Sequence, residues 1–445
     1  MAKKGNIVKR TKSDIILLVI VLLAVSWVCV LINLGVDKEK KEQNALIETA
    51  KVYLEDKLYI RAVNNYKKAL SNYNTENNAI LEDELVALYL EAGMMDDYYE
   101  LIEERIEKGT AAETEYLILA DRYIEDERYT KAIPILQSGI EQYENEQMIE
   151  KREEIIYENR IRTVNLPELK QPAENWIVPA FDGQKWGYIT NSGSVMLDFI
   201  YEEATQFCDG YAVVKLDGVY TLIDENGYWN AIDKIGLESV TDISSSAIVG
   251  RKDGKYQIYS RTFQLLSEES FDAVYMNENG LYVVQRDGKW AILSSELKNV
   301  TDYIFTDVAV NSRGKIFTNN YAMVKDEKGY CLVDKKGEPL YENRFADAKG
   351  FEGGLCAVAD AQGNWGFADG SGEMIIDYQY GDACSFSCNL AAVEYGGLWG
   401  YINRYNHMII EPKYVTAFPF IEGTAMTETE LGSFEILTLK YFELF

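Results

Sequence analysis

The chain has 445 residues and a net charge of −28, from 44 Lys and Arg against 72 Asp and Glu. A chain of this length can bury more than one hydrophobic core. Its acidity argues against nucleic acid as a partner, because phosphate contacts need clustered cations. Histidine occurs only at position 407, which excludes Ser-His-Asp and Cys-His catalysis from most of the chain and multi-histidine metal sites throughout.

The N-terminal region has the pattern of a membrane anchor. Residues 1–13 carry five cations and no acid, and residues 15–34 carry no charge. A helix of about twenty residues spans the hydrocarbon core of a bilayer, and its positive flank stays in the cytoplasm. We therefore predict a cytoplasmic basic tail over 1–13 and a single membrane helix over 14–36. The rest of this cell-membrane protein is expected outside the cytoplasm.

A cleaved signal peptide is the alternative for this region. Its apolar segment would be shorter and would be followed by a cleavage site of small residues. The sequence Ala-Val-Ser at 24–26 is such a site, but it lies inside the apolar run.

A helical repeat follows the anchor. Two copies have the same offsets between small and large apolar residues, which are Ala50, Tyr53, Ala62, Tyr66 and Ala69 in one copy and Ala120, Tyr123, Ala132, Leu136 and Gly139 in the other. A looser copy lies between them, with Val86, Tyr89, Gly93, Tyr98 and Ile102. This period near 34, with small residues where helices cross, resembles the tetratricopeptide repeat. The resemblance implies an α-solenoid of about three helix pairs over 41–161, with 146–161 as a final solvating helix.

Two roles are open for these helices. Stacked helix pairs form a concave face that commonly binds a peptide or a partner protein. The alternative is a rigid spacer that holds the next domain away from the membrane. Residues 162–175 contain Pro167 and Pro172, so we predict a linker there and a separable β domain over 176–445.

The β domain is marked by a glycine turn followed by an aromatic residue. The pair recurs eight times, and the aromatics are Trp186, Tyr220, Tyr256, Trp290, Tyr330, Trp365, Trp399 and Phe434. Four of the turns contain Asp-Gly, which favours a two-residue hairpin because both positions need a positive φ. A second register begins with Tyr201, Ala204 and Phe207 and recurs with nearly the same period. Both registers place one insertion between Phe305 and Gly329, centred on residues 311–314.

Three of the hairpins contain Trp-Gly, in residues 185–189, 364–367 and 398–402, and residues 410–414 read Ile-Glu-Pro-Lys-Tyr. These segments resemble the WG-repeat family, and the resemblance covers about residues 175–445. It implies a repetitive β architecture used for binding or scaffolding rather than catalysis.

Units of about 35 residues cannot each bury a core, so they must stack or close into a ring. Closure also removes exposed sheet edges. We predict an all-β, propeller-like ring of about seven units, with an open β array as the alternative. The recurring aromatics are expected to pack between units, because a binding site is usually made once whereas packing repeats with the fold.

The remaining reactive residues suggest no site. Five cysteines in the β region, at 208, 331, 356, 384 and 388, fit neither a disulfide framework nor a zinc site, and we interpret them as small buried residues. The acidic pairs at 202–203 and 268–269 would suit a glycoside hydrolase, but such pairs are expected on the surface of so acidic a chain. His407 lies in a polar turn, where an exposed bystander is expected.

We therefore predict no catalytic, cofactor-binding or metal-binding residues, and no cofactor. The expected function is that of a membrane-anchored, outward-facing, non-enzymatic scaffold with a protein or peptide partner. One alternative is a surface protein that binds cell-wall glycan through aromatics outside the repeat register, for which Trp229 and Tyr275 are the candidates. A hydrolase of cell-wall polymers is the other alternative.

Overall fold

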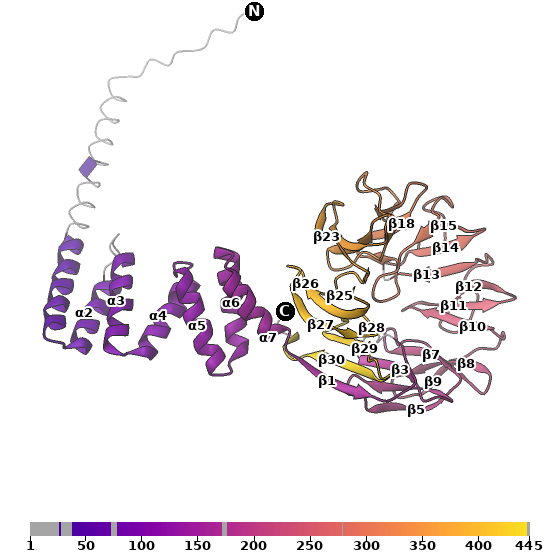
Figure 1. Ribbon diagram of the computed structural model, residues 1–445, viewed down its shortest axis with the longest axis horizontal. Coiled ribbons are helices and arrows are strands. Elements are labelled where there is room, and N and C mark those ends of the chain that lie inside the picture. Colours follow the sequence, from indigo (N-terminus) through magenta and orange to yellow (C-terminus); the bar gives the residue numbers. More distant parts are fainter. Residues whose placement is uncertain (1–25, 28–37, 73–77, 171–175, 278, 443–445) are drawn as a thin grey trace, which may run out of the picture. The chain divides into compact units, whose positions relative to one another are not determined.

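The computed structural model describes residues 26–27, 38–72, 78–170, 176–277 and 279–442 (Figure 1). The chain divides into two compact units, Met1–Arg152 and Glu153–Phe445. The predicted basic tail, and the membrane helix over 14–36 apart from residues 26–27, lie outside the described residues. Among the residues that are described, no helix is long and apolar enough to cross a membrane.

The first unit is helical. Its described helices are residues 38–55, α2 (Tyr59–Asn72), α3 (Asn78–Ala92), α4 (Met95–Glu107), α5 (Glu113–Glu125) and α6 (Tyr129–Tyr143), and α7 (Glu146–Ile156) begins in it. The three predicted pairs correspond to residues 38–55 with α2, α3 with α4, and α5 with α6. The prediction of a helical N-terminal region is confirmed.

The first helix of each pair ends in the same way. The residues Lys57, Gly93 and Glu127 have φ values of 56°, 65° and 56°. The next backbone N–H in each case donates to the carbonyl of a recurring tyrosine: Leu58 to Tyr53, Met94 to Tyr89 and Arg128 to Tyr123. This pairing is the Schellman motif, which stops a helix and turns the chain back. The loosest copy in the sequence therefore has the same turn as the other two.

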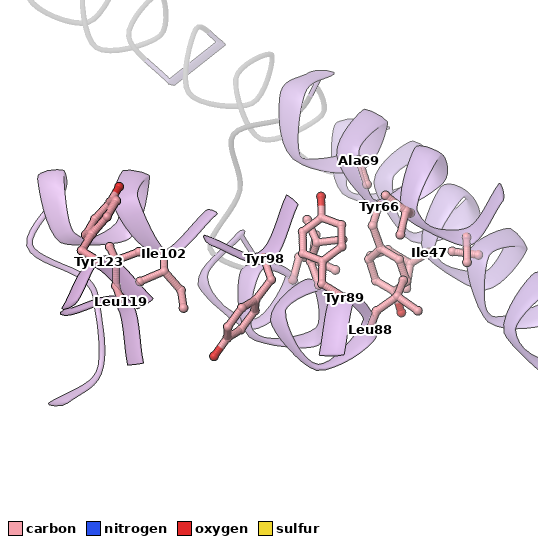
Figure 2. Close-up of a cluster of buried hydrophobic side chains, with 14 of the residues drawn as sticks. Ile47, Tyr66, Ala69, Leu88, Tyr89, Tyr98, Ile102, Leu119 and Tyr123 are labelled. Carbon is pink, nitrogen blue, oxygen red and sulfur yellow. The ribbon is translucent and has the colours of Figure 1, made fainter. Parts of the chain in front are cut away.

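Small residues lie where the helices cross, as the repeat predicts. Ala50, Ala62 and Ala132 are fully buried. A Cβ at Gly139 would lie 2.5 Å from Sδ of Met148 and 3.0 Å from Cγ of Tyr116, so glycine leaves room for these two side chains. Figure 2 shows how the tyrosines fill the core between the helices, where the middle copy buries Tyr98.

The second unit consists of eight antiparallel β-sheets. The first four, in chain order, are formed by β2 (Glu168–Leu169), β3 (Ile177–Phe181), β4 (Trp186–Thr190) and β5 (Val195–Tyr201); β6 (Glu203–Ala204), β7 (Tyr211–Leu216), β8 (Val219–Asp224) and β9 (Trp229–Ile232); β10 (Ser239–Ile243), β11 (Ala247–Lys252) and β12 (Lys255–Ser260); and β13 (Ala273–Met276), β14 (Tyr282–Arg286) and β15 (Lys289–Leu293). The other four are formed by β16 (Asp307–Val308), β17 (Phe317–Thr318), β18 (Tyr321–Lys325) and β19 (Tyr330–Asp334); β20 (Asp347–Ala348), β21 (Leu355–Ala359), β22 (Trp365–Asp369) and β23 (Met374–Tyr380); β24 (Asp382–Ala383), β25 (Leu390–Tyr395), β26 (Leu398–Asn403) and β27 (Met408–Tyr414); and β28 (Thr416–Ala417), β29 (Thr424–Glu428), β30 (Phe434–Leu439) and β1 (Asn159–Val164).

The sheets form a closed ring, an eight-bladed β-propeller. The eighth sheet is completed by β1, which pairs with β30 over six residues, from Asn159 opposite Leu439 to Val164 opposite Phe434. The eighth and first sheets share one core, in which Val164, Val178 and Ile436 are buried together. In Figure 1 the magenta strand β1 accordingly lies beside the yellow strand β30. The ring is therefore closed, and the open β array is wrong.

The predicted number of about seven units is also wrong. The eight glycine-aromatic hairpins include the one in the first sheet, but the second register begins only at Tyr201, because the inner strand β2 of the first sheet lies in the predicted linker. Leu166 and Leu169 lie 35 residues before Tyr201 and Ala204 and so occupy the same register positions. The register is hard to recognise because Leu166 is aliphatic whereas Tyr201 is aromatic. The β unit accordingly begins before the predicted boundary at 176. Residues 159–161 are strand rather than helix, and the stretch 162–175 contains the end of β1 and all of β2.

The recurring aromatics pack between sheets. Five of the eight are buried, namely Tyr220, Trp290, Tyr330, Trp365 and Phe434, and the other three are half-buried. The Asp-Gly turns at 217–218, 253–254 and 287–288 have a positive φ at both positions, as predicted. The turn at 182–183 differs, because Phe181 pairs with Trp186 across a four-residue loop.

Candidate functional site: the central pocket

A pocket of about 930 Å³ lies at the centre of the β unit. Its lining comes from six different sheets, mainly through the inner strands and the connections that follow them, with Tyr256 of β12 and Tyr282 of β14 in addition. Residues 204–209 are the end of β6 and the connection after it. Residues 240–246 are most of β10 and the connection after it, and residues 272–277 include β13. This volume is in the range of small-molecule sites in proteins.

One wall of the pocket is the insertion that the sequence places at 311–314. We define the insertion loop as residues 310–316, between β16 and β17. The Asn311 side-chain oxygen accepts hydrogen bonds from the backbone N–H groups of Arg313 at 3.0 Å and Lys315 at 2.9 Å. This side chain folds the loop into a tight turn, and Arg313, Gly314 and Lys315 then line the pocket.

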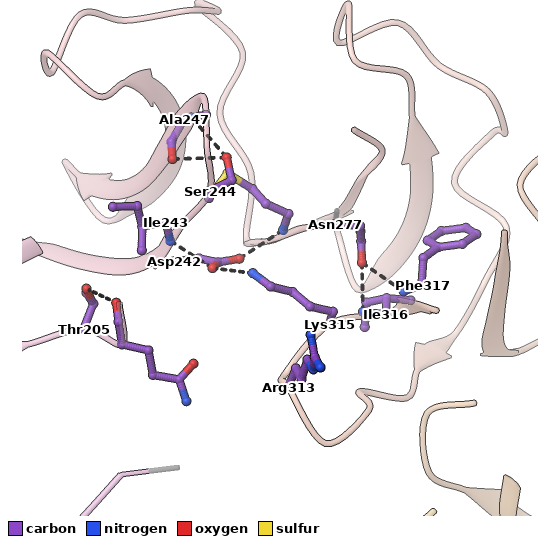
Figure 3. Close-up of polar contacts among 12 residues, drawn as sticks. Thr205, Asp242, Ile243, Ser244, Ala247, Asn277, Arg313, Lys315, Ile316 and Phe317 are labelled. Atoms are coloured by element: carbon purple, nitrogen blue, oxygen red, sulfur yellow. Dashed lines mark hydrogen bonds and ion pairs between the residues drawn. The ribbon is translucent and has the colours of Figure 1, made fainter. Parts of the chain in front are cut away.

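The insertion loop is fixed by the sheets on both sides of it. Asn277 Oδ1, at the end of β13, accepts hydrogen bonds from the backbone N–H groups of Ile316 and Phe317, both at 2.9 Å (Figure 3). On the other side, Ser312 N donates to Glu352 Oε2 at 2.9 Å, and the Gly350 N–H donates to the Val310 carbonyl at 2.8 Å. These contacts hold the loop in one position.

A partly buried ion pair joins the loop to a distant sheet. Lys315 Nζ lies 2.8 Å from Asp242 Oδ1, and the two side chains are only 17% and 19% exposed. Asp242 belongs to β10, and it also accepts hydrogen bonds from the N–H groups of Ile243 and Met276. Figure 3 shows Lys315 reaching across to this carboxylate, with Arg313 beside it. The pair thus connects the third and fifth sheets.

A second cation lies on another part of the wall. Lys170 Nζ donates to the Ala204 carbonyl at 2.8 Å and lies 4.3 Å from the ring centre of Trp186. Burial of this ammonium group lowers its pKa below the ordinary value for lysine. A buried ammonium with one carbonyl partner keeps donors available for a ligand.

Three carboxylates of the pocket have basic partners. Asp242 pairs with Lys315, Asp209 lies 3.6 Å from Arg261, and Asp272 pairs with Lys255. The hydrogen bond from Lys255 is the main reason why the pKa of Asp272 is below its usual value. Glu422 is the fourth acid of the lining, so three of its four carboxylates have a basic partner.

The two off-register aromatics lie in different places. Tyr275 lines the pocket on β13, and its ring packs 5.7 Å from Trp290. Trp229 is 61% exposed on β9, the outermost strand of its sheet. They do not form one site. The single insertion is the sequence feature that marks this pocket. The sequence did not predict its cations, Arg313 and Lys315, as site residues.

The acidic pairs have structural partners. Glu203 accepts a hydrogen bond from the Tyr220 hydroxyl at 2.6 Å and pairs with Lys215. Glu269 pairs with Arg286 at 3.0 Å. These carboxylates stabilise neighbouring strands and turns, and the pocket residues include neither pair.

The single histidine and the cysteines also lie outside any evident reactive cluster. His407 is 46% exposed at its side chain, and its Nδ1 lies 3.7 Å from Glu153, so it has a carboxylate neighbour that the sequence did not predict. Cys331 and Cys356 are buried, the other three described cysteines are half-buried, and all five are free thiols. Within the described ranges, no group of three or more His, Cys, Asp or Glu is arranged to hold a metal ion.

Comparison with known proteins supports the repeat assignment. A family model described as "WG containing repeat" matches residues 186–220, 270–290, 365–399 and 399–429. The predicted WG repeats are therefore confirmed in the C-terminal region. No curated protein is significantly similar to the whole sequence.

Several solved structures share a remote likeness with the chain. The AfRom2 CNH domain is 10% identical, with 64% of this chain and 99% of that one covered and a TM-score of 0.32. AztD from Citrobacter koseri is 12% identical, with 64% and 92% covered and a TM-score of 0.36. The extracellular domain of the putative one component system BT4673 from B. thetaiotaomicron is 12% identical, with 61% and 51% covered and a TM-score of 0.30. These scores are too low to indicate what the present chain binds.

Proposed function

We propose that this protein is a membrane-anchored, outward-facing binding or scaffold protein without enzymatic activity, and that its partners include a protein or peptide. One observation carries the proposal. In both units the recurring residues pack inside the fold. The two repeat units therefore act as rigid scaffolds, and the residues that do not recur are the ones available for recognition. Repeat architectures of this kind commonly serve as recognition surfaces, and the match to the WG repeat agrees with such a role.

The helical unit is proposed as the protein-binding part, in the manner of tetratricopeptide repeats. The three Schellman turns and the buried small residues support stacked helix pairs of that type. The first helix of each pair also carries an exposed aliphatic side chain, namely Val52, Ile80 and Ile118. Exposed apolar groups on successive helices suit an apolar partner segment.

Photo-crosslinking in cells tests the protein partner. A photoreactive residue at Ile118 of the full-length protein should give a discrete protein adduct. The same residue at Leu431, which is 94% exposed in a turn of the β unit, serves as the control and should give none. Equal labelling at both positions, or no adduct at Ile118, would contradict a protein partner for the helices.

The membrane anchor rests on the sequence of residues 1–36 and needs its own test. Protease added to intact cells should digest residues 38–445 and spare the basic tail. The expected orientation follows from the five cations that precede the apolar segment. Protection of the C-terminal units in intact cells, with digestion after lysis, would show that the orientation is wrong.

A further inference from the structure

We propose that the central pocket binds an acidic sugar, and that Arg313 and Lys315 of the insertion loop receive its carboxylate. The inference rests on the proposed function in one respect, namely that the β unit is a binding domain. It goes further in naming a ligand class and the residues that select it.

The insertion loop is the one place where extra residues interrupt the sequence repeat. Both sequence registers hold their period elsewhere and are interrupted only here. The inserted residues do not extend into solvent as a free loop, because three backbone groups of the loop tie it to the neighbouring sheets through Asn277, Glu352 and Gly350. An insertion that is fixed on both sides and contributes its own residues to the pocket lining has the features of a segment that forms a binding site.

The charge of the loop favours an anionic group. Lys315 uses one of its three donors on Asp242, which fixes the direction of the ammonium group and leaves two donors for a ligand. Arg313, two residues earlier, adds a guanidinium whose planar donors match a carboxylate. Three of the four acids that line the pocket, Asp209, Asp242 and Asp272, are paired with Arg261, Lys315 and Lys255, so the negative charge near the loop is offset; the fourth acid is Glu422.

The rest of the wall favours a sugar as the carrier of that group. It offers neutral hydroxyl groups and two half-buried aromatic rings, from Thr205, Thr241, Ser245, Ser246, Tyr256 and Tyr275. Hydroxyl groups exchange hydrogen bonds with sugar hydroxyls, and aromatic rings pack against the apolar faces of sugar rings. A volume of about 930 Å³ suits one or two sugar rings better than an extended peptide.

Isothermal titration calorimetry on the full-length protein tests the proposal with a matched pair of sugars. N-acetylmuramic acid differs from N-acetylglucosamine by a lactyl group that carries a carboxylate. We expect the acidic sugar to bind at least about tenfold more tightly, because its carboxylate accepts charge-assisted hydrogen bonds that the neutral sugar cannot form. Added salt should reduce this preference, because Arg313 is exposed to solvent ions.

Variants locate the site. Arg313→Gln and Lys315→Gln should each weaken binding of the acidic sugar by about tenfold and leave binding of the neutral sugar nearly unchanged. Lys298→Gln is the control, because Lys298 is an exposed lysine paired with Glu296 and does not line the pocket. Its affinity for both sugars should equal that of the wild type. Arg313 is exposed, so Arg313→Gln should fold even if Lys315→Gln does not.

Three results would overturn the proposal: equal affinity for the two sugars, unchanged affinity in the Arg313→Gln variant, or no binding of either sugar. The last result is distinguishable from failure of the proposed function as a whole. The adduct at Ile118 in the helical unit reports on the protein partner independently of the pocket.

Discussion

The glycine of the Trp-Gly motif has a specific packing reason. A Cβ at Gly187, Gly366 or Gly400 would lie 2.8, 2.5 or 2.4 Å from a backbone carbonyl oxygen of the next strand. In each case the pairing with that strand shifts its register at this point. The motif therefore combines an aromatic that packs between sheets with a glycine that lets the outer strand approach. It occurs where the outer strand is seven residues long, in β5, β23 and β27.

This reasoning predicts the effect of Gly366→Ala. The added methyl group would meet the Ile376 carbonyl oxygen at 2.5 Å, so the strands must separate, and we expect a loss of about 1–3 kcal/mol in unfolding free energy. Gly370→Ala in the same sheet is the control, because its Cβ would be no closer than 3.7 Å to Phe351. Thermal melts of the two variants check this. Similar melting temperatures would mean that the close approach is not needed.

The role of the recurring aromatics is tested by Trp365→Ala. Trp365 is buried in one core with Phe367 and Tyr380, so the truncation should leave a cavity and cost about 3–5 kcal/mol. Trp229→Ala removes the same side chain from an exposed position and should leave the melting temperature nearly unchanged. If Trp365→Ala melted like the wild type, the packing role would be refuted and the aromatic positions would become candidates for ligand contact.

The buried thiols predict a dependence on pH. Burial raises the pKa of Cys356 from 9.0 to about 12. The thiol stays neutral in the folded chain while it ionises in the unfolded chain, so its contribution to stability is complete below pH 9 and is lost as the pH rises toward 12. At pH 8 we expect Cys356 to resist iodoacetamide until the protein unfolds, which mass spectrometry of the labelled peptides will show. Rapid labelling of Cys356 in the native protein would contradict its burial.

At the scale of elements, β1 is the strand that completes the ring. A chain of residues 153–445 contains it, and a chain of residues 165–445 lacks it and exposes the edge of β30. We expect the longer chain to unfold cooperatively and the shorter one to be less stable and prone to aggregate, because an unpaired edge recruits other strands. Circular dichroism and light scattering measure the two outcomes. The shorter chain should match the longer one only if β1 is dispensable.

The sequence predicted elements best where a side-chain pattern repeats. The hairpins, the helix pairs and the single insertion follow from periodicity, because each repeated contact requires the same residue type at the same offset. Strand β1 has no such signature: its sequence Asn-Arg-Ile-Arg-Thr-Val follows a polar helix directly and carries two arginines. Its strand conformation comes from pairing with β30, which is distant in sequence, so local pattern could not reveal it.

The central pocket was beyond prediction for a related reason. Its lining comes from six sheets, and only the closed ring brings Asp242 and Lys315 together across 73 positions of the chain. The sequence located the insertion loop but not its partner. Tyr275 was the one candidate that the ring places in the pocket, and it was identified because it departs from the repeat.

At the scale of the whole molecule, the two compact units should unfold as separate transitions. Gly139→Leu inserts a side chain where Cγ of Tyr116 is 3.0 Å away, and it should lower only the helical transition. Trp365→Ala should lower only the β transition. Differential scanning calorimetry of the full chain resolves the two effects. A single transition that both variants shift equally would show that the units unfold as one.

The closure of the ring by β1 also sets an order of events during synthesis. Asn159 pairs with Leu439, which is synthesised 439 − 159 = 280 residues later. At roughly 5–20 residues per second, the ribosome takes roughly 14–56 s to supply that partner. During this interval β1 is unpaired while other sheets are already forming. Each of those sheets has an edge strand with which β1 could pair. The nascent chain therefore depends on keeping β1 from pairing with another strand until β30 has been made, and the propeller cannot close before that point.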